Sequence, residues 1–226
     1  MQDIPNADYL LAEQLQRVLY VEDFTDRDIL AAWASVVNPS AARLLSQAFV
    51  KHTGNVITQA RKHFDGLRAA VPTLKGLVLV DQTAVTLQTG RDLRELMWQR
   101  REIENYLLHP AVICRLTSRL MPQDWDLLAV QASRKADELL RQRMTAADFQ
   151  NPLADSTTLK DIRGSAFLEE FFRDLFKEFG LYNVMPKWEF YRIAAEMKPE
   201  EIHPEVIAVL DTIVEVLRGQ TSPEDG

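Results

Sequence analysis

Four acidic residues occupy positions from which they could bind a divalent cation. Glu22 and Asp81 each follow directly on a short apolar run, Asp26 lies four residues beyond Glu22, and Glu104 lies in a later, largely apolar stretch. Carboxylate oxygens are hard ligands, and Mg²⁺ usually takes a few of them and completes its octahedron with water and substrate phosphate. Three or four converging acids can therefore hold one or two such ions. Two ions about 4 Å apart would clamp the attacking and leaving oxygens of a phosphodiester.

Each of these acids also has an ordinary structural interpretation. An acid at the end of a parallel strand often caps the next helix, which would explain Glu22 or Asp81 taken singly, and Asp26 could cap a helix that begins near residue 28. Glu102 and Glu104 could pair with the two arginines before them on a solvated face. These interpretations weaken when the acids are considered together.

The elements that must position the acids follow an α/β pattern. The short apolar runs Arg17–Val21 and Leu74–Val80 are typical of buried strands in a parallel sheet. Helical periodicity predicts helices before and between these strands, over Ala7–Gln16, Asp28–Val37 and Thr58–Val71. In open parallel sheets, ligands bind beyond the carboxyl ends of the strands, so the two strand-end acids are expected to meet there.

The second half of the chain has a different pattern. From about Arg91 onward we expect no comparable strand, and helical periodicity predicts helices over Asp92–Tyr106, Trp125–Thr145, Ser165–Phe179, Lys187–Met197 and Pro204–Leu217. The expected organisation is therefore an α/β catalytic core over 1–115 and a helical region over 116–218, packed on or beside it. The polar tail over 219–226 is expected to be disordered.

Composition and absent motifs exclude several classes of protein. Of the 226 residues 46% are hydrophobic, which suffices for a core, and the single cysteine, Cys114, allows neither an internal disulfide nor a cysteine-based zinc cluster. The sequence contains no GxxxxGK[ST], GxGxxG or HExxH motif, and the four histidines lack ligand-like spacing. No apolar run is long enough to span a membrane and no signal peptide is recognised, so a cytoplasmic location is expected.

The charge is unevenly distributed along the chain. Residues 1–115 contain 13 basic and 13 acidic residues, whereas residues 116–226 contain 13 basic and 20 acidic residues, which gives a formal net charge of −7. Proteins that coat nucleic acid through bulk electrostatics usually carry the opposite sign. An enzyme that approaches phosphate through a bound metal ion is not excluded.

Several segments resemble one known family. The run VLYVEDFTDRDIL, with Glu22 and Asp26, resembles the first motif of Toprim (topoisomerase–primase) domains, and LVLVDQT, with Asp81 and Thr83, lies where such domains carry Asp-x-Asp. The run REIENYLL, with Glu104, resembles a signature that follows the Toprim core in the overcoming-lysogenisation-defect (OLD) family of ATPase-linked nucleases. PKWEFYRIA and PEVIAVLD are similar to the helical tail of those proteins.

The resemblance implies a Toprim-like (Rossmann-like) fold, a mainly parallel sheet flanked by helices and followed by a helical region. It also implies an endonuclease dependent on Mg²⁺ or Mn²⁺, in which Glu22, Asp81 and Glu104 are catalytic and bind metal together with Asp26. In the family an ABC-type ATPase precedes the nuclease, so an ATPase domain or protein absent from this chain is an expected partner, beside the nucleic acid substrate. Family members use a basic residue in the helical region, for which the candidates are the lysines at 160 and 187.

Two positions depart from the family pattern. Asp23 stands where the family usually has glycine, and Thr83 stands in place of the second aspartate of Asp-x-Asp. A threonine hydroxyl is a poorer cation ligand than a carboxylate, although Glu104 or Glu102 could compensate for it. The alternative is a degenerate, non-catalytic Toprim-like module that docks an ATPase partner. The choice between DNA and RNA stays open, as does the oligomeric state, for which a homo-oligomer is one option.

Overall fold

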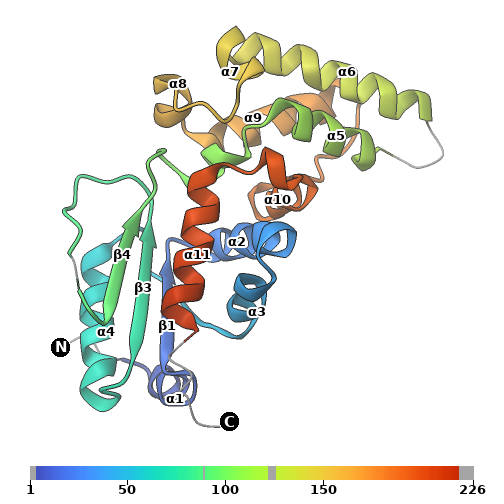
Figure 1. The fold of residues 1–226 in the computed structure, drawn as a ribbon. Helices are drawn as coiled ribbons and strands as arrows, with labels where there is room; N and C mark the ends of the chain where they lie inside the picture. Colours follow the sequence, from blue (N-terminus) through green and yellow to red (C-terminus); the bar gives the residue numbers. More distant parts are fainter. Residues whose placement is uncertain (1–3, 89, 122–125, 219–226) are drawn as a thin grey trace, which may run out of the picture.

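A computed structural model describes residues 4–88, 90–121 and 126–218 of the chain. The fold is built on a sheet of parallel strands in the order β2–β1–β3–β4, of which Figure 1 labels β1, β3 and β4. The strands are β1 (Arg17–Val21), β2 (Phe49–His52), β3 (Lys75–Val80) and β4 (Leu93–Met97). The predicted α/β class, with a parallel sheet flanked by helices and a helical C-terminal region, is confirmed.

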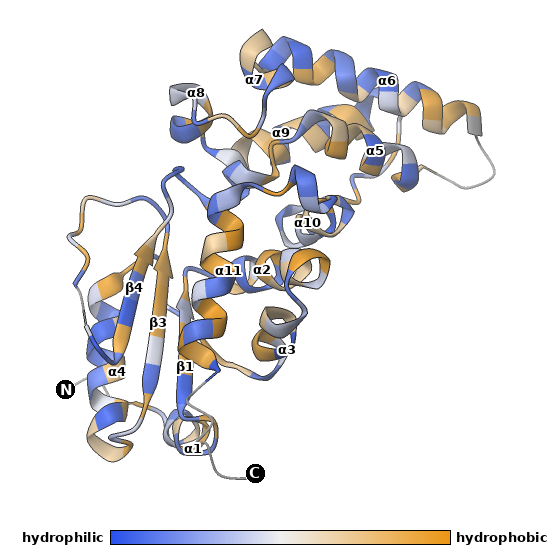
Figure 2. Ribbon diagram, in the orientation of Figure 1, coloured by the Kyte–Doolittle hydropathy of each residue, from blue (hydrophilic) through white to orange (hydrophobic). Residues whose placement is uncertain are grey.

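Alternating side chains of the strands face two different layers of helices. Leu19 and Val21 of β1 belong to one core cluster, and Val18 and Tyr20 belong to the other, as expected for a period of two residues. Helices on the first face are α2 (Phe24–Val37), α3 (Pro39–Gln47) and α11 (Pro204–Leu217), and helices on the second are α1 (Asn6–Leu15) and α4 (Ile57–Ala70). Figure 2 shows the hydrophobic colouring of the upper part of β3 and of one side of α11, which packs against β3.

The helical part of the chain continues from the sheet. It contains α5 (Pro110–Leu120), α6 (Asp126–Arg143), α7 (Ala146–Gln150), α8 (Thr157–Asp161), α9 (Gly164–Glu178) and α10 (Tyr191–Glu196). Short 3₁₀ helices lie at η1 (Ile103–Leu107), η2 (Lys187–Glu189) and η3 (Pro199–Glu201). Helix α10 packs against α2, and α5 packs against α6. The division of the chain near residue 115 stays a prediction. In the described ranges, no helix is both long enough and apolar enough to cross a membrane.

The prediction for residues 92–106 is wrong. Instead of one helix, this segment forms strand β4, a connecting loop and η1, so a strand does follow Arg91. The cause is Glu95, which lies in the middle of β4 and is buried because Arg61 pairs with it at 2.7 Å. An inward-facing acid breaks the apolar alternation by which an edge strand is recognised. Strand β2 was also not predicted.

Most other predicted elements are confirmed within a few residues. Strand β1 has the predicted bounds, and α4, α9 and α11 start and end within one residue of the predicted limits. Helix α2 begins at Phe24, earlier than the predicted Asp28, because Asp23 caps it. The predicted disordered tail, 219–226, and the start of the predicted helix at Trp125 lie outside the described residues.

Candidate functional site

The carboxyl ends of β1 and β3 bring the two strand-end acids together. The strands are hydrogen-bonded neighbours with Tyr20 paired to Val78, so Glu22 and Asp81 emerge side by side. Glu22 lies close enough to Asp81 to raise its pKa, and Asp81 accepts a hydrogen bond of 3.2 Å from the backbone N–H of Ile103. Asp81 therefore ties the end of the sheet to η1 and does not cap a helix.

The turn after β1 adds two more acids. The side chain of Asp23 accepts a hydrogen bond of 2.7 Å from the backbone N–H of Thr25 and so caps α2. Asp26, in the first turn of α2, is buried and accepts a hydrogen bond of 3.0 Å from the backbone N–H of Glu22. The helix-capping interpretation of Asp26 is wrong, because Asp23 has that role. Asp26 instead holds the backbone that carries Glu22.

Glu104 comes to the same place from a third segment. It lies on η1, is only 2% exposed, and its Oε1 atom is 3.3 Å from Nζ of Lys187. That oxygen forms no hydrogen bond with any described residue. Nζ of Lys187 lies 3.1 Å from Oδ2 of Asp23 as well, so one ammonium bridges two of the acids.

The close approach of these acids strongly perturbs their protonation. Burial, together with the neighbouring carboxyl group of Glu22, raises the pKa of Asp81 to about 10. Burial and the charges of Asp23, Glu104 and Glu22 raise the pKa of Asp26 to about 8. The pKa of Glu104 is also raised by burial, and Lys187 opposes that effect. Clusters of carboxylates with raised pKa values are frequent at functional sites and stabilise a bound cation.

In contrast to Asp26 and Asp81, Lys187 and Asp23 are stabilised in their charged forms because they are paired with each other. Burial disfavours the charged form of Lys187, but Glu104 and Asp23 outweigh burial and raise its pKa. Burial likewise acts against the charge of Asp23, but its bonds with Thr25 and Lys187 lower its pKa overall. At neutral pH this ion pair is therefore charged on both sides.

The structure separates the alternatives that the sequence left open for Glu102 and the two lysines. Glu102 accepts a hydrogen bond of 2.9 Å from the backbone N–H of Ser165 and another from the side chain of Arg163. It therefore does not belong to the acid cluster, which consists of Glu22, Asp23, Asp26, Asp81 and Glu104. The interpretation of Glu102 and Glu104 as a solvated face is wrong, because both are buried. Lys160 approaches Asp155 at 3.8 Å, whereas Lys187 lies in the acid cluster.

Buried polar residues around η1 hold Glu104 in place, and sequence reasoning did not identify them. Asn105 is fully buried, donates hydrogen bonds of 2.9 Å to the carbonyl oxygens of Leu159 and Ile162, and accepts one of 3.1 Å from the backbone N–H of Gly164. Arg100, 1% exposed, donates to the carbonyl oxygen of Asn105 and to two carbonyls of the 152–154 segment. The signal in the sequence was a polar pair, Glu-Asn, inside an apolar run.

Close packing at Gly164 supports the same turn. A Cβ atom at this position would lie 2.6 Å from the backbone nitrogen and the Oδ1 atom of Asn105 and 2.7 Å from the backbone carbon of Glu104. The start of α9 can therefore approach η1 only because residue 164 has no side chain.

The residues of the acid cluster are gathered but do not form a complete shell of metal ligands. Within the described ranges of the chain, no three His, Cys, Asp or Glu side chains are arranged to hold a metal ion as they stand. Thr83, two residues beyond Asp81, is half-buried, and its hydroxyl forms no hydrogen bond with a described residue. The donor chemistry nevertheless fits a hard divalent cation, because the acids are oxygen ligands, repel one another, and leave Oε1 of Glu104 without a hydrogen bond.

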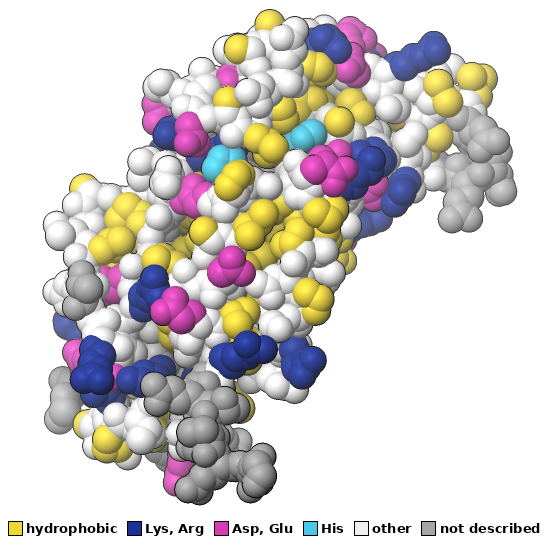
Figure 3. All heavy atoms as spheres, viewed as in Figure 1, with side chains coloured by type: hydrophobic (Ala, Val, Ile, Leu, Met, Phe, Trp, Pro, Cys, Tyr) yellow, Lys and Arg dark blue, Asp and Glu magenta, His cyan; other side chains and the backbone are white. Residues whose placement is uncertain are grey.

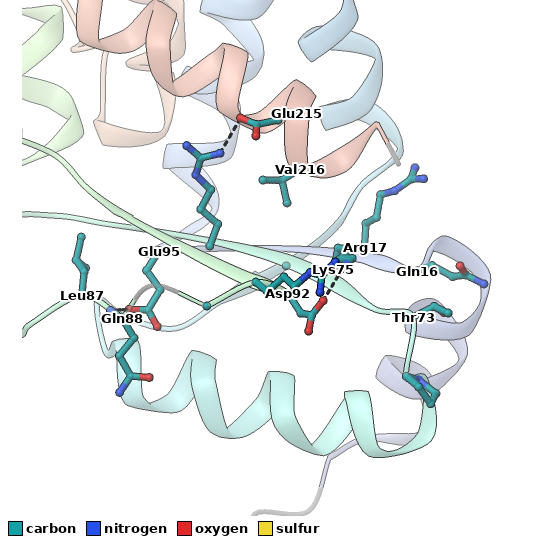
Figure 4. Close-up of a pocket in the computed structure, with 15 residues that line it drawn as sticks. Gln16, Arg17, Thr73, Lys75, Leu87, Gln88, Asp92, Glu95, Glu215 and Val216 are labelled. Carbon is teal, nitrogen blue, oxygen red and sulfur yellow. Dashed lines mark hydrogen bonds and ion pairs between the residues drawn. The ribbon is translucent and has the colours of Figure 1, made fainter. Parts of the chain in front are cut away.

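A cavity of about 1140 Å³ lies at the other end of the sheet, where β1, β3 and β4 begin. Its charged residues are mostly paired, as Figure 4 shows for Lys75 with Asp92. Figure 3 shows several Lys and Arg side chains near this lower end of the molecule. The acids predicted to carry chemistry do not line this cavity.

Comparisons with known proteins give a structural likeness but no family. No protein-family model matches the chain, and no curated protein matches it. Among solved structures, the chain is similar to the C-terminal region of the Burkholderia pseudomallei OLD protein, with a TM-score of 0.48 and 12% sequence identity. The match covers 90% of this chain and 98% of that one. At this level of similarity we draw no conclusion about activity from it.

Proposed function

We propose that this chain is a nuclease that hydrolyses phosphodiester bonds with the help of Mg²⁺ or Mn²⁺. In this proposal Glu22, Asp26, Asp81 and Glu104 hold the metal, and Glu22, Asp81 and Glu104 are the catalytic acids. The observation that carries it is the gathering of acids from three distant segments at the carboxyl ends of two adjacent parallel strands. Ligands of open α/β sheets bind at this location.

The raised pKa values support a cation site over a structural one. Acids that only stabilise a fold are usually paired with Lys or Arg, which lowers their pKa. Asp26 and Asp81 each accept one backbone N–H bond but pair with no cation in the part of the chain that the structure describes, and burial and neighbouring acids make them bind protons more tightly than free carboxyls do. A divalent ion would replace these protons and remove the repulsion.

A bound ion at this site would lower the pKa of a coordinated water and offset charge on the phosphate oxygens. The residues of this chain supply the remaining functions. The bond from the backbone of Glu22 to Asp26 and the Asn105 bonds fix the backbone positions of Glu22 and Glu104, so only side chains have to move. Because the acids do not yet form a ligand shell, their side chains must close around the ion.

Lys187 is the positive group that this chain itself brings to the site. A lysine ammonium has three N–H donors; one donates to Asp23, and Glu104 lies 3.3 Å away as an ion-pair partner. A remaining N–H can bind a phosphate oxygen of the substrate and stabilise the negative charge that develops during hydrolysis. The excess of acid in residues 116–226 argues that bulk charge does not recruit nucleic acid, so we propose that an ATPase partner delivers it.

The test compares two acids at opposite ends of the sheet. The full chain is incubated with supercoiled plasmid or single-stranded RNA and with Mg²⁺ or Mn²⁺, and cleavage is measured on gels. Glu22→Gln is expected to abolish cleavage, and Asp92→Asn, a matched loss of one acid far from the site, is expected to leave it unchanged. Equal cleavage by Glu22→Gln and the wild-type chain would refute the assignment.

The runner-up function is a non-catalytic module that docks an ATPase. Two observations favour it: Lys187 already neutralises part of the acid cluster, and Thr83 replaces an expected acid. Calorimetry with Mn²⁺ separates the two functions. A module of this kind would bind no ion at millimolar concentration, whereas the nuclease would.

A further inference from the structure

We propose that the ammonium of Lys187 takes the place of a second metal ion, so that the site binds one divalent ion instead of two. This inference rests on the proposed function and specifies which acids bind the lysine and which bind the metal ion. Asp23 and Glu104 hold the lysine, and Glu22, Asp26 and Asp81 face the single ion, with Glu104 between the two positions.

The first observation is the position of Lys187 itself. Its Nζ atom lies 3.1 Å from Oδ2 of Asp23 and 3.3 Å from Oε1 of Glu104, two residues from different segments of the chain. Of the residues that the structure describes, no other Lys, Arg or His side chain comes within 4 Å of an acid in the cluster. The lysine side chain is 33% exposed, so its ammonium lies at the rim and still reaches the buried Glu104.

The second observation is the double role of Asp23. Its Oδ1 atom caps α2 through Thr25, and its Oδ2 atom contacts Lys187. Both oxygens are therefore occupied, and the helix cap fixes the carboxylate in an orientation that suits the ammonium. A divalent ion at this position would have to break the ion pair and lie a few ångströms from a second positive charge.

The two departures from the expected motif then have one explanation. The sequence gains an acid at position 23 and has a neutral Thr83 in place of the second aspartate beyond β3. The gained acid contacts an ammonium, and the lost acid removes a ligand for a metal ion. The number of carboxylates is therefore unchanged, but the number of divalent ions that they can bind falls by one.

The test counts Mn²⁺ ions bound to the full chain. Metal-free protein is titrated with Mn²⁺ alone, and bound ions are counted by calorimetry and by the electron paramagnetic resonance signal of the free ion. The wild-type chain is expected to bind one ion and Lys187→Met two, a twofold change in stoichiometry. Lys187→Arg, which keeps the charge, and Lys160→Met, which removes a lysine outside the cluster, are expected to bind one.

Two results would overturn the inference and leave the proposed function in place: two ions bound to the wild-type chain, or one ion bound to Lys187→Met. The absence of any ion on the wild-type chain would instead overturn the proposed function.

A second measurement covers the case in which Lys187→Met does not fold without metal. Lys187→Gln then serves as the variant, and the rise in melting temperature on adding saturating Mn²⁺ is the readout. Because every bound ion stabilises the folded chain, the rise is expected to be larger in the variant than in the wild-type chain. An equal or smaller rise contradicts the inference.

Discussion

Acidic residues that the structure describes lie toward both ends of the sheet, but those near the amino ends are paired with cations and most of those at the carboxyl ends are not. Toward the amino ends of the strands, Asp92 pairs with Lys75 (Figure 4), and Glu95 in the middle of β4 pairs with Arg61 at 2.7 Å; the pKa values of both acids are lowered. At the carboxyl ends, five acids are gathered and Lys187 pairs with only two of them, Asp23 and Glu104. The pKa values of Asp26, Asp81 and Glu104 are raised.

This difference distinguishes acids that stabilise the fold from acids available to a ligand. A paired carboxylate has already exchanged its hydration for a protein cation, so it has little to gain from a metal ion. A buried carboxylate among other carboxylates stays costly to ionise until a cation arrives. The cavity at the amino ends is larger than any space needed for an ion, but its acids are already neutralised.

The largest expected effect is on cleavage. Asp81→Asn removes a central member of the acid cluster, and we expect the rate to fall about a thousandfold or more, since loss of a metal ligand costs several kcal/mol of transition-state stabilisation. The same variant is expected to unfold at a higher temperature at pH 8, because a neutral amide replaces a carboxyl that is costly to ionise. Single-turnover kinetics and thermal unfolding measure the two effects. A rate within tenfold of wild type would contradict the site.

The pH dependence of stability is expected to have opposite signs at the two ends. Asp26 and Asp81 ionise near pH 4 when unfolded but at about 8 and about 10 when folded, so without metal they lower stability progressively as the pH rises from about 4 to about 10. Asp92 and Glu95, with lowered values, stabilise the fold above their unfolded pKa values, and this contribution is lost as the pH falls below about 4.

Urea unfolding at pH 5 and pH 9 measures this effect. We expect the wild-type chain to lose several kcal/mol between these values without metal, because each of the two acids contributes up to about 1.4 kcal/mol per pH unit, and Asp81→Asn to lose less. An identical slope for the two chains would show that Asp81 is not the group that resists ionisation.

A smaller effect is expected at the turn that holds Glu104. Asn105→Ala removes hydrogen bonds to two carbonyl oxygens and one N–H in a fully buried position, which is expected to cost about 2–4 kcal/mol of stability. Asn38→Ala, which removes a half-buried helix cap, is the control and is expected to cost about 1 kcal/mol. If Asn105→Ala costs no more than this control, the network does not hold the turn.

An element of this fold is predictable from the sequence when the residues that determine it are adjacent in the chain. Strand β1 and its following acid were predicted from a run of five residues, because a strand buried on both faces is apolar throughout. Strand β4 was missed because the buried acid at its centre is explained only by Arg61, 34 positions away in the chain. Edge strands whose inward side chain is charged have no local signature.

The site was predictable to the same extent. Glu22 and Asp81 were found because parallel strands place their ends together, which is a rule of topology. Glu104 was preferred to Glu102 only through the family resemblance, since both lie in one motif and spacing alone does not tell which of them η1 turns toward the cluster. Lys187 was one of two candidate lysines, and its role depends on contacts across 164 positions in the sequence.

The smallest effect is expected at the amino end of the sheet. A substitution there tests the difference between the two ends, because it should change neither cleavage nor Mn²⁺ binding at the carboxyl end. Asp92 is near the surface and pairs with Lys75 and Arg68, and ion pairs of this kind contribute less than about 1 kcal/mol. Asp92→Asn should therefore shift the urea midpoint only slightly, at constant slope. Cleavage and Mn²⁺ stoichiometry should equal those of the wild-type chain. A loss of Mn²⁺ binding in this variant would mean that the two ends of the sheet are coupled, and that the pairing of acids alone does not decide which end binds the ion.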